Sequence, residues 1–253
     1  MDEVESFREQ VAARSRDHRW AVAVVGHTGS TNADLVRRAR AGECPAFTAL
    51  IALEQGTGRG RLDRAWSTPR GTSIALSMAT PLVGTPATWG LLPLATGVAV
   101  VRALGRLGVI AGLKWPNDVL IDGLKVCGIL VEVAGSRAVA GAGINVGQTA
   151  ATIGFPGAVS LAMAGCPATR EVVAALVLDE CGAVFDEVVQ DPRGVVAAYR
   201  AVCTTVGQSV RVQLGDQTEV VGRADGVADD GQLLVDVDGE IRTFASGDVY
   251  HLR

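Results

Sequence analysis

The pattern of hydrophobic and polar positions predicts a mixed α and β protein. Helical spacing of apolar and charged residues predicts helices at 2–19, 33–39, 91–107 and 171–189. Short apolar runs bounded by turn residues predict strands at 20–25, 46–53, 73–78, 118–121, 127–133 and 138–145. An Asp122-Gly123 turn joins two of these strands as a hairpin, and the segment 56–71 is expected to be a glycine-rich loop.

The pattern changes near Gly207, where short β-prone runs separated by turn residues replace the longer elements. These runs lie at 210–214, 219–222, 233–237 and 241–244. They predict a small antiparallel barrel of about 45 residues, which is too small to bury much core alone and should dock on the rest of the chain. The predicted domains are residues 1–205 and 206–253.

Composition narrows the class of protein. Of 253 residues, 48% are hydrophobic and 20% are charged, which excludes global disorder. A net charge of −4 argues against general affinity for nucleic acid, so we expect no DNA partner. The N-terminus is too acidic for a signal peptide, and the longest apolar stretch, 89–101, is too short to cross a bilayer. We therefore expect a cytoplasmic protein without a membrane contact.

Cysteine and histidine supply no recognisable site. The five cysteines never form Cys-x-x-Cys and the three histidines are scattered, so neither a disulfide framework, a zinc site nor a histidine triad follows. Lysine is more informative, because only Lys114 and Lys125 are lysines among 23 basic residues. Either the composition has drifted toward arginine, or lysine is kept where a planar guanidinium cannot replace a compact ammonium.

The segment 56–71 contains four arginines, Arg59, Arg61, Arg64 and Arg70, against a single acidic residue. Glycines let a backbone approach a ligand, and guanidinium groups bind phosphate or carboxylate through two hydrogen bonds. The segment lacks the ending of a P-loop and does not match the dinucleotide-binding fingerprint. It is equally well interpreted as a solvated surface loop.

Two more segments carry candidate chemistry. Lys125 follows a turn at the start of a strand, and Gly128 leaves room for a ligand beside the backbone, although an ordinary hairpin with exposed charges has the same pattern. The run Ser30-Thr31-Asn32 offers hydroxyl and amide groups at a helix N-terminus. Such a run is a helix cap in most proteins and a polar-ligand site in a minority.

Taken together in this order and spacing, these segments resemble the motifs of the biotin protein ligases. The motifs are Gly29-Ser30-Thr31-Asn32, Glu54-Gln55 with Gly58-Arg59-Gly60-Arg61 and Trp66, Lys114-Trp115-Pro116-Asn117-Asp118, Lys125 with Gly128-Ile129-Leu130-Val131-Glu132, and Gly141-Ala142-Gly143-Ile144-Asn145-Val146. The resemblance covers roughly residues 20–253. It implies an α+β fold, with a mixed-sheet catalytic domain like that of class II synthetases and a small C-terminal SH3-like barrel.

The resemblance also implies a two-step ligase reaction. Biotin's carboxylate attacks the α-phosphorus of ATP to give biotinoyl-5′-AMP and pyrophosphate, and a lysine of a biotin carboxyl carrier domain of an acyl-CoA carboxylase then displaces AMP. Mg²⁺ is expected with the nucleotide, with unknown ligands. Only 28 residues precede Gly29, so we expect the catalytic-only kind without the DNA-binding domain of repressor members. Members of the family are monomers or homodimers, and both states stay open.

Individual roles follow from the same resemblance. The residues implied to bind biotin are Ser30, Thr31, Asn32, Gln55, Arg59, Gly60, Arg61, Lys125 and Gly128. Those implied to bind ATP are Arg61, Arg64, Trp66, Asn117, Lys125 and Asn145. The implied catalytic residues are Lys125, Arg61 and Asp118, with Lys125 stabilising developing charge and Asp118 orienting the acceptor amine. Lys114 matches its motif but has no defined role.

Two alternatives remain at this point. A lipoate–protein ligase shares the fold and the adenylation chemistry, and differs in releasing pyrophosphate with lipoate and not with biotin. A non-catalytic biotin or adenylate sensor would bind its ligand without transferring it. The intact arginine segment and Lys125 favour a catalyst, because both reaction steps build negative charge that preorganised cations stabilise.

Overall fold

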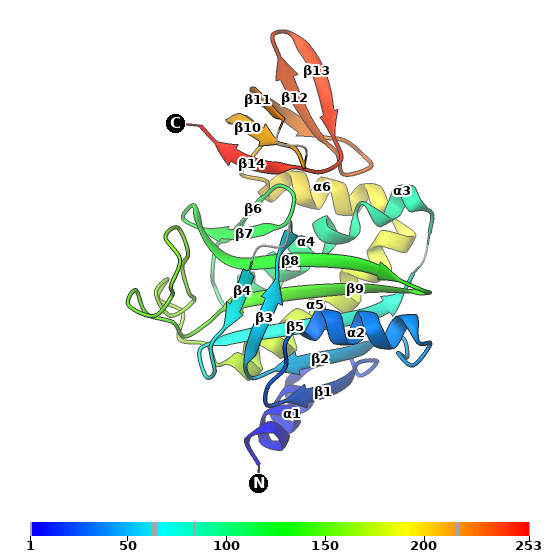
Figure 1. Ribbon diagram of the computed structural model, residues 1–253, viewed down its shortest axis with the longest axis vertical. Coiled ribbons are helices and arrows are strands. Elements are labelled where there is room, and N and C mark those ends of the chain that lie inside the picture. The colour runs from blue at the N-terminus through cyan, green and yellow to red at the C-terminus, as the bar shows by residue number, and fades with distance from the viewer. Residues whose placement is uncertain (1, 62–64, 83, 216–217, 253) are drawn as a thin grey trace.

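The computed structural model describes residues 2–61, 65–82, 84–215 and 218–252 (Figure 1). Its helices are α1 (Glu3–Arg14), α2 (Thr31–Arg40), α3 (Pro86–Trp89), α4 (Leu92–Gly105), α5 (Arg170–Gln190) and α6 (Pro192–Val202). The strands of the main sheet are β1 (Ala21–Val25), β2 (Thr48–Ala52), β5 (Ser73–Pro81), β6 (Gly112–Lys114), β7 (Asp118–Ile121), β8 (Leu124–Ala134) and β9 (Arg137–Asn145).

The main sheet has seven strands in the order β1-β2-β5-β9-β8-β7-β6. β1 and β2 run parallel, and every other neighbouring pair is antiparallel. Strands β9 and β8 are paired along both edges, so their backbones are held on two sides. The mixed sheet with covering helices confirms the predicted α+β class.

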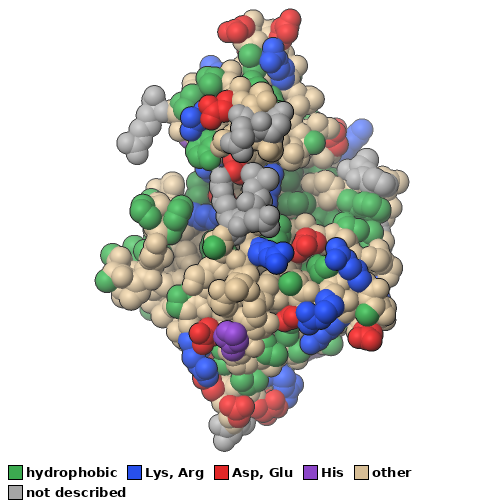
Figure 2. Space-filling view, in the orientation of Figure 1, with side chains coloured by type: hydrophobic (Ala, Val, Ile, Leu, Met, Phe, Trp, Pro, Cys, Tyr) green, Lys and Arg blue, Asp and Glu red, His purple; other side chains and the backbone are tan. Residues whose placement is uncertain are grey.

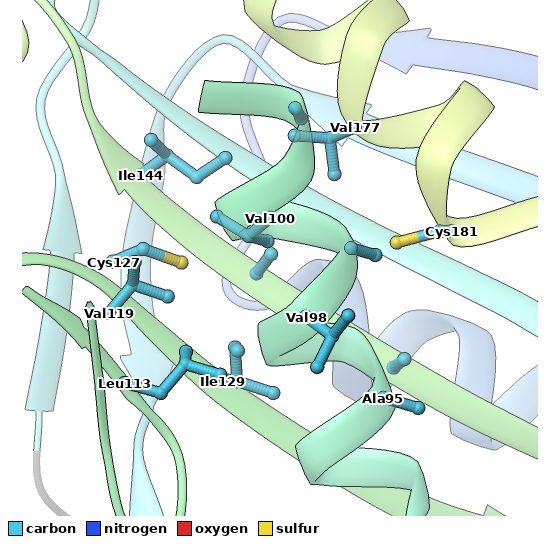
Figure 3. Packing of buried hydrophobic residues seen from close by; sticks show 14 of the residues in the cluster. Ala95, Val98, Val100, Leu113, Val119, Cys127, Ile129, Ile144, Val177 and Cys181 are labelled. Carbon is cyan, nitrogen blue, oxygen red and sulfur yellow. The ribbon is translucent and has the colours of Figure 1, made fainter. Parts of the chain in front are cut away.

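Helices cover both faces of this sheet (Figure 1). α2 and the hairpin of β3 (Gln55–Arg59) and β4 (Ala65–Thr68) lie on the near face, and α4 and α5 lie behind it, with α6 packed on them toward the C-terminal strands. Figure 3 shows α4 as the centre of the core, with Val98 between the sheet residue Ile129 and the α5 residue Cys181. A helix enclosed in this way is apolar on nearly every side, which is what made the pattern over 91–107 easy to identify. None of the described helices is long and apolar enough to cross a membrane.

The predicted N-terminal helix over 2–19 is wrong at its end, because α1 stops at Arg14. The carboxylate of Asp179 on α5 accepts hydrogen bonds from Ser15 Oγ at 2.8 Å and from the backbone amides of Arg16 at 2.7 Å and Asp17 at 3.2 Å. These bonds replace the helical ones and turn the chain toward β1. A partner so distant in the sequence leaves no local signal.

The segment predicted as a loop at 56–71 is wrong at both ends, where it forms the hairpin β3 (Gln55–Arg59) and β4 (Ala65–Thr68). Gly58 pairs with Trp66, and a Cβ on Gly58 would lie 2.3 Å from the Trp66 carbonyl oxygen. The glycine that suggested a loop is therefore what permits the close pairing.

Residues after α6 form a five-stranded antiparallel sheet on the β6 edge of the main sheet (Figure 1). Its strands, in the order β13-β12-β11-β10-β14, are β10 (Ser209–Gln213), β11 (Glu219–Val227), β12 (Leu233–Val237), β13 (Glu240–Phe244) and β14 (Asp248–His251). Four of the five were predicted, and α6, β6 and β14 were not. β6 and β14 are only three and four residues long, too short for a clear hydrophobic period.

His251 lies where this sheet meets the main domain, with Nε2 3.1 Å from Thr205 Oγ1. Burial, and then the charge of Lys114, lower the pKa of His251. The folded state therefore disfavours the protonated ring, and stability that is present above the unfolded pKa of about 6.5 is lost as the pH falls through the lower folded pKa.

We expect the Tm of the wild type to fall more than that of His251→Gln between about pH 7.5 and pH 5.5. Equal falls by differential scanning fluorimetry would contradict this.

Candidate functional site

The near face of the main sheet carries most of the predicted site residues, where the N-terminus of α2 meets β3, β4, β8 and β9. Ser30 is the N-cap of α2, with extended backbone and its Oγ accepting from the Ala33 amide at 3.3 Å. This cap directs the next two side chains, Thr31 and Asn32, into the protein, where both are buried.

Thr31 and Gln55 form a buried neutral polar cluster with Ser77 of β5. The Thr31 amide donates to Gln55 Oε1 at 3.0 Å, and the Thr31 hydroxyl lies 2.8 Å from Ser77 Oγ. None of these groups is charged, and each presents a fixed donor or acceptor. The cluster is therefore suited to a polar, uncharged ligand.

Asn32 extends this cluster toward β8 and β9. Its Nδ2 donates to Glu132 Oε2 at 2.6 Å, which fixes the orientation of the amide. Asn32 Oδ1 is buried and has no partner among the described residues, although an unpaired buried acceptor of this kind costs about 1–3 kcal/mol. The oxygen lies over Gly141, whose Cβ would be only 2.6 Å away. An N–H group of a ligand would satisfy it.

Lys125 is held beside a carboxylate and an aromatic ring. Its Nζ lies 2.6 Å from Asp118 Oδ1 and 5.4 Å from the centroid of the Trp66 ring. The two charged side chains are 26% and 23% exposed, so the ion pair can be reached by a ligand. Gly128 makes room for this arrangement, since its Cβ would be 3.1 Å from both Lys125 Nζ and the Trp66 ring.

The Trp66 indole lies over Gly143 of β9. A Cβ on Gly143 would be 2.2 Å from Trp66 Nε1, so the ring occupies the space that a side chain would need. Trp66 Nε1 is buried without a partner among the described residues. Trp66 therefore connects two parts of the site. Its backbone pairs with Gly58 on β3, the strand that begins at Gln55, and its ring lies near Lys125.

A hollow of about 340 Å³ opens beside the polar cluster. It is lined by Ser30, Ala33, Arg59, Gly60, Arg61, Leu130 and Glu132. Arg59 at the end of β3 and Arg61 just after it therefore line the same space as the α2 N-terminus. Figure 2 shows further basic side chains gathered over α2 on this face, and the last turn of α2 contributes Arg37, Arg38 and Arg40. Arg64, a predicted nucleotide contact, lies outside the described residues.

Asn117 and Asn145 are placed differently from the other predicted residues. Asn117 Nδ2 donates to the Ile129 carbonyl at 2.8 Å, and Asn145 Nδ2 donates to the Val159 carbonyl at 3.3 Å. Gln148 Nε2 donates to Asn145 Oδ1 at 2.9 Å. Both asparagines therefore hold strands and loops together around the site, whatever they also contact in a ligand.

Glu132 is the residue that sequence reasoning missed. It belongs to the Gly128–Glu132 motif but had no assigned role, and the structure places it against Asn32 and in the arginine-lined hollow. The described residues contain no group of three or more His, Cys, Asp or Glu side chains able to hold a metal. Asp118 contacts Lys125 and Glu132 contacts Asn32, so the two carboxylates belong to different parts of the site.

Comparison with known proteins gives consistent matches. The biotin/lipoate A/B protein ligase family matches residues 27–148, and the biotin protein ligase C-terminal domain matches residues 205–252. The chain is 40% identical to the biotin–[acetyl-CoA-carboxylase] ligase of Mycobacterium tuberculosis, over 98% of this chain and 95% of that protein. It is 32% identical to the bifunctional ligase/repressor BirA of Escherichia coli, over 90% and 73%. The solved biotin protein ligase from Aquifex aeolicus in complex with biotin and ATP is 25% identical, with a TM-score of 0.78 and coverage of 92% and 98%.

Proposed function

This chain belongs to the biotin/lipoate A/B protein ligase family, and we infer that it is an ATP-dependent ligase that attaches biotin to protein. Biotin is activated as biotinoyl-5′-AMP and transferred to a lysine of a biotin carboxyl carrier domain. The observation that carries this function is the neutral polar cluster of Thr31, Gln55 and Asn32, linked through Trp66 to the Lys125–Asp118 ion pair. One end suits an uncharged ureido ring, and the other suits a reacting carboxylate.

We propose that the bicyclic head of biotin is bound by the α2 N-terminus and β3. Ser30, Thr31 and Gln55 supply hydrogen bonds to the ureido group, and Asn32 Oδ1 accepts one of its N–H groups. Glu132 keeps the Asn32 amide turned in that direction. The neutral cluster avoids the cost of burying an unpaired charge against an uncharged ligand.

The adenylation step takes place at Lys125. A biotin carboxylate oxygen forms a bond to the α-phosphorus of ATP, and the bond from that phosphorus to the pyrophosphate oxygen breaks. The Lys125 ammonium stabilises the charge on the carboxylate and α-phosphate as the bond forms. The intermediate is covered by Arg59, Gly60 and Arg61. The nucleotide is contacted by Arg61 and Arg64, and Trp66 offers a surface on which adenine can stack. Mg²⁺, when bound with ATP, would supply positive charge that offsets the charge of the phosphates.

In the transfer step, the acceptor lysine amine attacks the biotinoyl carbonyl, and AMP leaves. Asp118 lies beside Lys125 and is placed to orient the incoming amine through a hydrogen bond. Asn117 and Asn145 support the strands that carry these groups. The catalytic unit is residues 1–205, and residues 206–253 form the C-terminal domain.

A lipoate–protein ligase is the alternative within the family. The buried hydroxyl and amide groups around Thr31 favour biotin, because the dithiolane ring of lipoate offers no N–H or carbonyl to pair with them. Incubating the protein with ATP, Mg²⁺ and either acid, and measuring pyrophosphate, distinguishes the two. Biotin-dependent release followed by labelling of a carrier domain supports our assignment. Release with lipoate alone would refute it, and binding without transfer would indicate a sensor.

Arg61→Ala is expected to release biotinoyl-AMP about tenfold faster, because the loop over the intermediate loses a guanidinium that faces the hollow. The affinity for biotin in the absence of ATP should change less than about threefold, because we place the bicyclic head of biotin in the neutral polar cluster. Retention of labelled intermediate through rapid gel filtration measures the first quantity, and equilibrium dialysis the second. Arg40→Ala on the exposed end of α2 is the matched control. Unchanged retention in Arg61→Ala would remove this role.

A further inference from the structure

The hairpin formed by β6 and β7 lies between the C-terminal domain and the Lys125–Asp118 pair. Its register places Lys114 opposite Asp118, and Asp118 in turn opposite Gly128 on β8. β6 therefore lies toward the C-terminal domain, and β7 carries Asp118, a carboxylate of the candidate site. Trp115 begins the turn that joins the two strands.

At this end the hairpin is held by hydrogen bonds to the junction residues Thr204 and Thr205 and to the C-terminal domain, and one of them runs from the Thr204 hydroxyl to the Leu113 carbonyl at 3.1 Å. The Thr204 amide donates to the Leu113 carbonyl at 2.7 Å, and the Trp115 amide donates to Thr205 Oγ1 at 3.0 Å. The Trp115 indole Nε1 donates to the Gly231 carbonyl at 3.0 Å. Trp115 is 1% exposed and Thr205 is fully buried, so water cannot replace either partner when a bond is lost.

Gly231 is itself fixed by the main domain. It has a positive φ of 86°, and a Cβ there would approach Leu91 Cδ2 at 3.1 Å and Leu94 Cδ2 at 3.2 Å. The β11-β12 turn thus inserts its backbone against the start of α4. The Gly231 carbonyl, which accepts from the Trp115 indole, is therefore held in place by close packing against Leu91 and Leu94.

We propose that Trp115 and Thr205 are positioning residues, through which the C-terminal domain and the junction that precedes it set Asp118 against Lys125 for catalysis. This inference rests on the proposed function of that ion pair. The ion pair is formed by Lys125 of β8 and Asp118 of β7, both in the main sheet. The C-terminal domain and the junction fix the hairpin strand that carries Asp118, and a displacement of about 1 Å at a reacting group can slow a reaction by two orders of magnitude.

The biotin-head cluster gives this proposal a distinctive kinetic signature. Thr31, Gln55 and Ser77 lie on α2, β3 and β5, which are not part of the β6-β7 hairpin. Loosening the hairpin should therefore lower the rate at saturating substrate and leave the KM for biotin nearly unchanged. A general loss of folding would instead lower the amount of active enzyme and the Tm together.

The test compares pyrophosphate release by four full-length variants. Thr205→Val removes the hydroxyl that accepts from the Trp115 amide and that also lies 3.1 Å from His251 Nε2, Thr205→Ser keeps this hydroxyl, and Trp115→Phe removes the indole donor. Arg200→Met is the matched control, because Arg200 Nε donates to the Val227 carbonyl at 2.6 Å and so joins the same two domains away from the hairpin. We expect kcat to fall about tenfold in Thr205→Val and Trp115→Phe, with KM for biotin within about twofold, and to stay within about twofold of wild type in Thr205→Ser and Arg200→Met.

Wild-type kcat in folded Thr205→Val or Trp115→Phe would overturn the proposal, as would an equal fall in Arg200→Met. If Thr205→Val or Trp115→Phe does not fold, the other variant tests the same hairpin through a different hydrogen bond. Lys125→Met is assayed in parallel. Loss of activity there with normal Trp115→Phe and Thr205→Val would refute the positioning role and leave the proposed function intact. Full activity in Lys125→Met would refute the role of Lys125, whereas a wild type without biotin-dependent pyrophosphate release would refute the proposed function itself.

Discussion

Replacing Lys125 by arginine should slow biotin-dependent pyrophosphate release by about 10²–10³-fold, even though the positive charge is kept. Lys125 Nζ already lies 2.6 Å from Asp118 and close to Trp66 and Gly128. A guanidinium is wider than an ammonium and directs its donors in a fixed plane. It would displace Asp118 or Trp66 in a space that is filled on three sides.

Two controls separate charge from shape in this experiment. Lys125→Met removes the charge without adding width, and a comparable loss would show that the ammonium is needed as well as its size. Lys114→Arg changes the other lysine of the chain, whose Nζ lies 5.9 Å from the centroid of the Tyr250 ring, a contact that arginine also makes. We expect Lys114→Arg to stay within about threefold of wild type. Single-turnover measurement of adenylate formation gives the rate directly, and a near-normal rate for Lys125→Arg would refute the role.

The two lysines illustrate what the sequence could predict. Lys125 was expected at the start of a strand, and the structure places it near the start of β8, where the Lys125 side chain and the Trp66 ring occupy the space beside Gly128. The ion pair with Asp118 needed the pairing of β7 with β8, which a hairpin signal at Asp122-Gly123 already implied. Lys114 kept no role in the sequence, because Tyr250 belongs to β14, a strand too short to be recognised.

Contacts between distant segments explain most of what was missed. α1 ends early because Asp179 lies under the turn that follows it, and no residue near Arg14 signals this. Glu132 gained its role only when β8 was placed beside α2, which brought its carboxylate to Asn32. The hydrophobic period predicts that an element exists. It does not predict which element lies against which.

The glycines of β9 also show which features the sequence predicts and which depend on contacts between distant segments. The sequence marked 138–145 as a strand punctuated by glycine, without a reason for Gly141 and Gly143. The structure supplies one for each, since Asn32 Oδ1 lies over Gly141 and the Trp66 indole lies over Gly143. Both glycines belong to the site because the absence of a side chain is what lets a polar or aromatic group approach the sheet.

Gly143→Ala should therefore slow adenylation by about 100-fold at a fixed ATP concentration, the second large effect that we predict. The new methyl group would lie 2.2 Å from Trp66 Nε1 and 2.3 Å from Trp66 Cε2. β9 cannot move away, because Gly143 is paired with Ala75 on β5 and with Gly128 on β8. The ring must leave its place instead, so Lys125 would lose its aromatic neighbour and ATP would lose the surface that we propose for its adenine.

Gly147→Ala is the matched control, because a Cβ there meets nothing closer than Thr72 Cα at 3.7 Å and should leave the rate within about twofold of wild type. Biotin affinity by equilibrium dialysis should change little in Gly143→Ala, since the head cluster does not include Trp66. A double-mutant cycle sharpens the assignment: the smaller ring of Trp66→Phe should cost less in the Gly143→Ala background than in the wild type, because the overlap that Gly143→Ala creates is with the indole. Additive losses would place the effect of Gly143 elsewhere, and a fully active Gly143→Ala would show that the indole does not need that space.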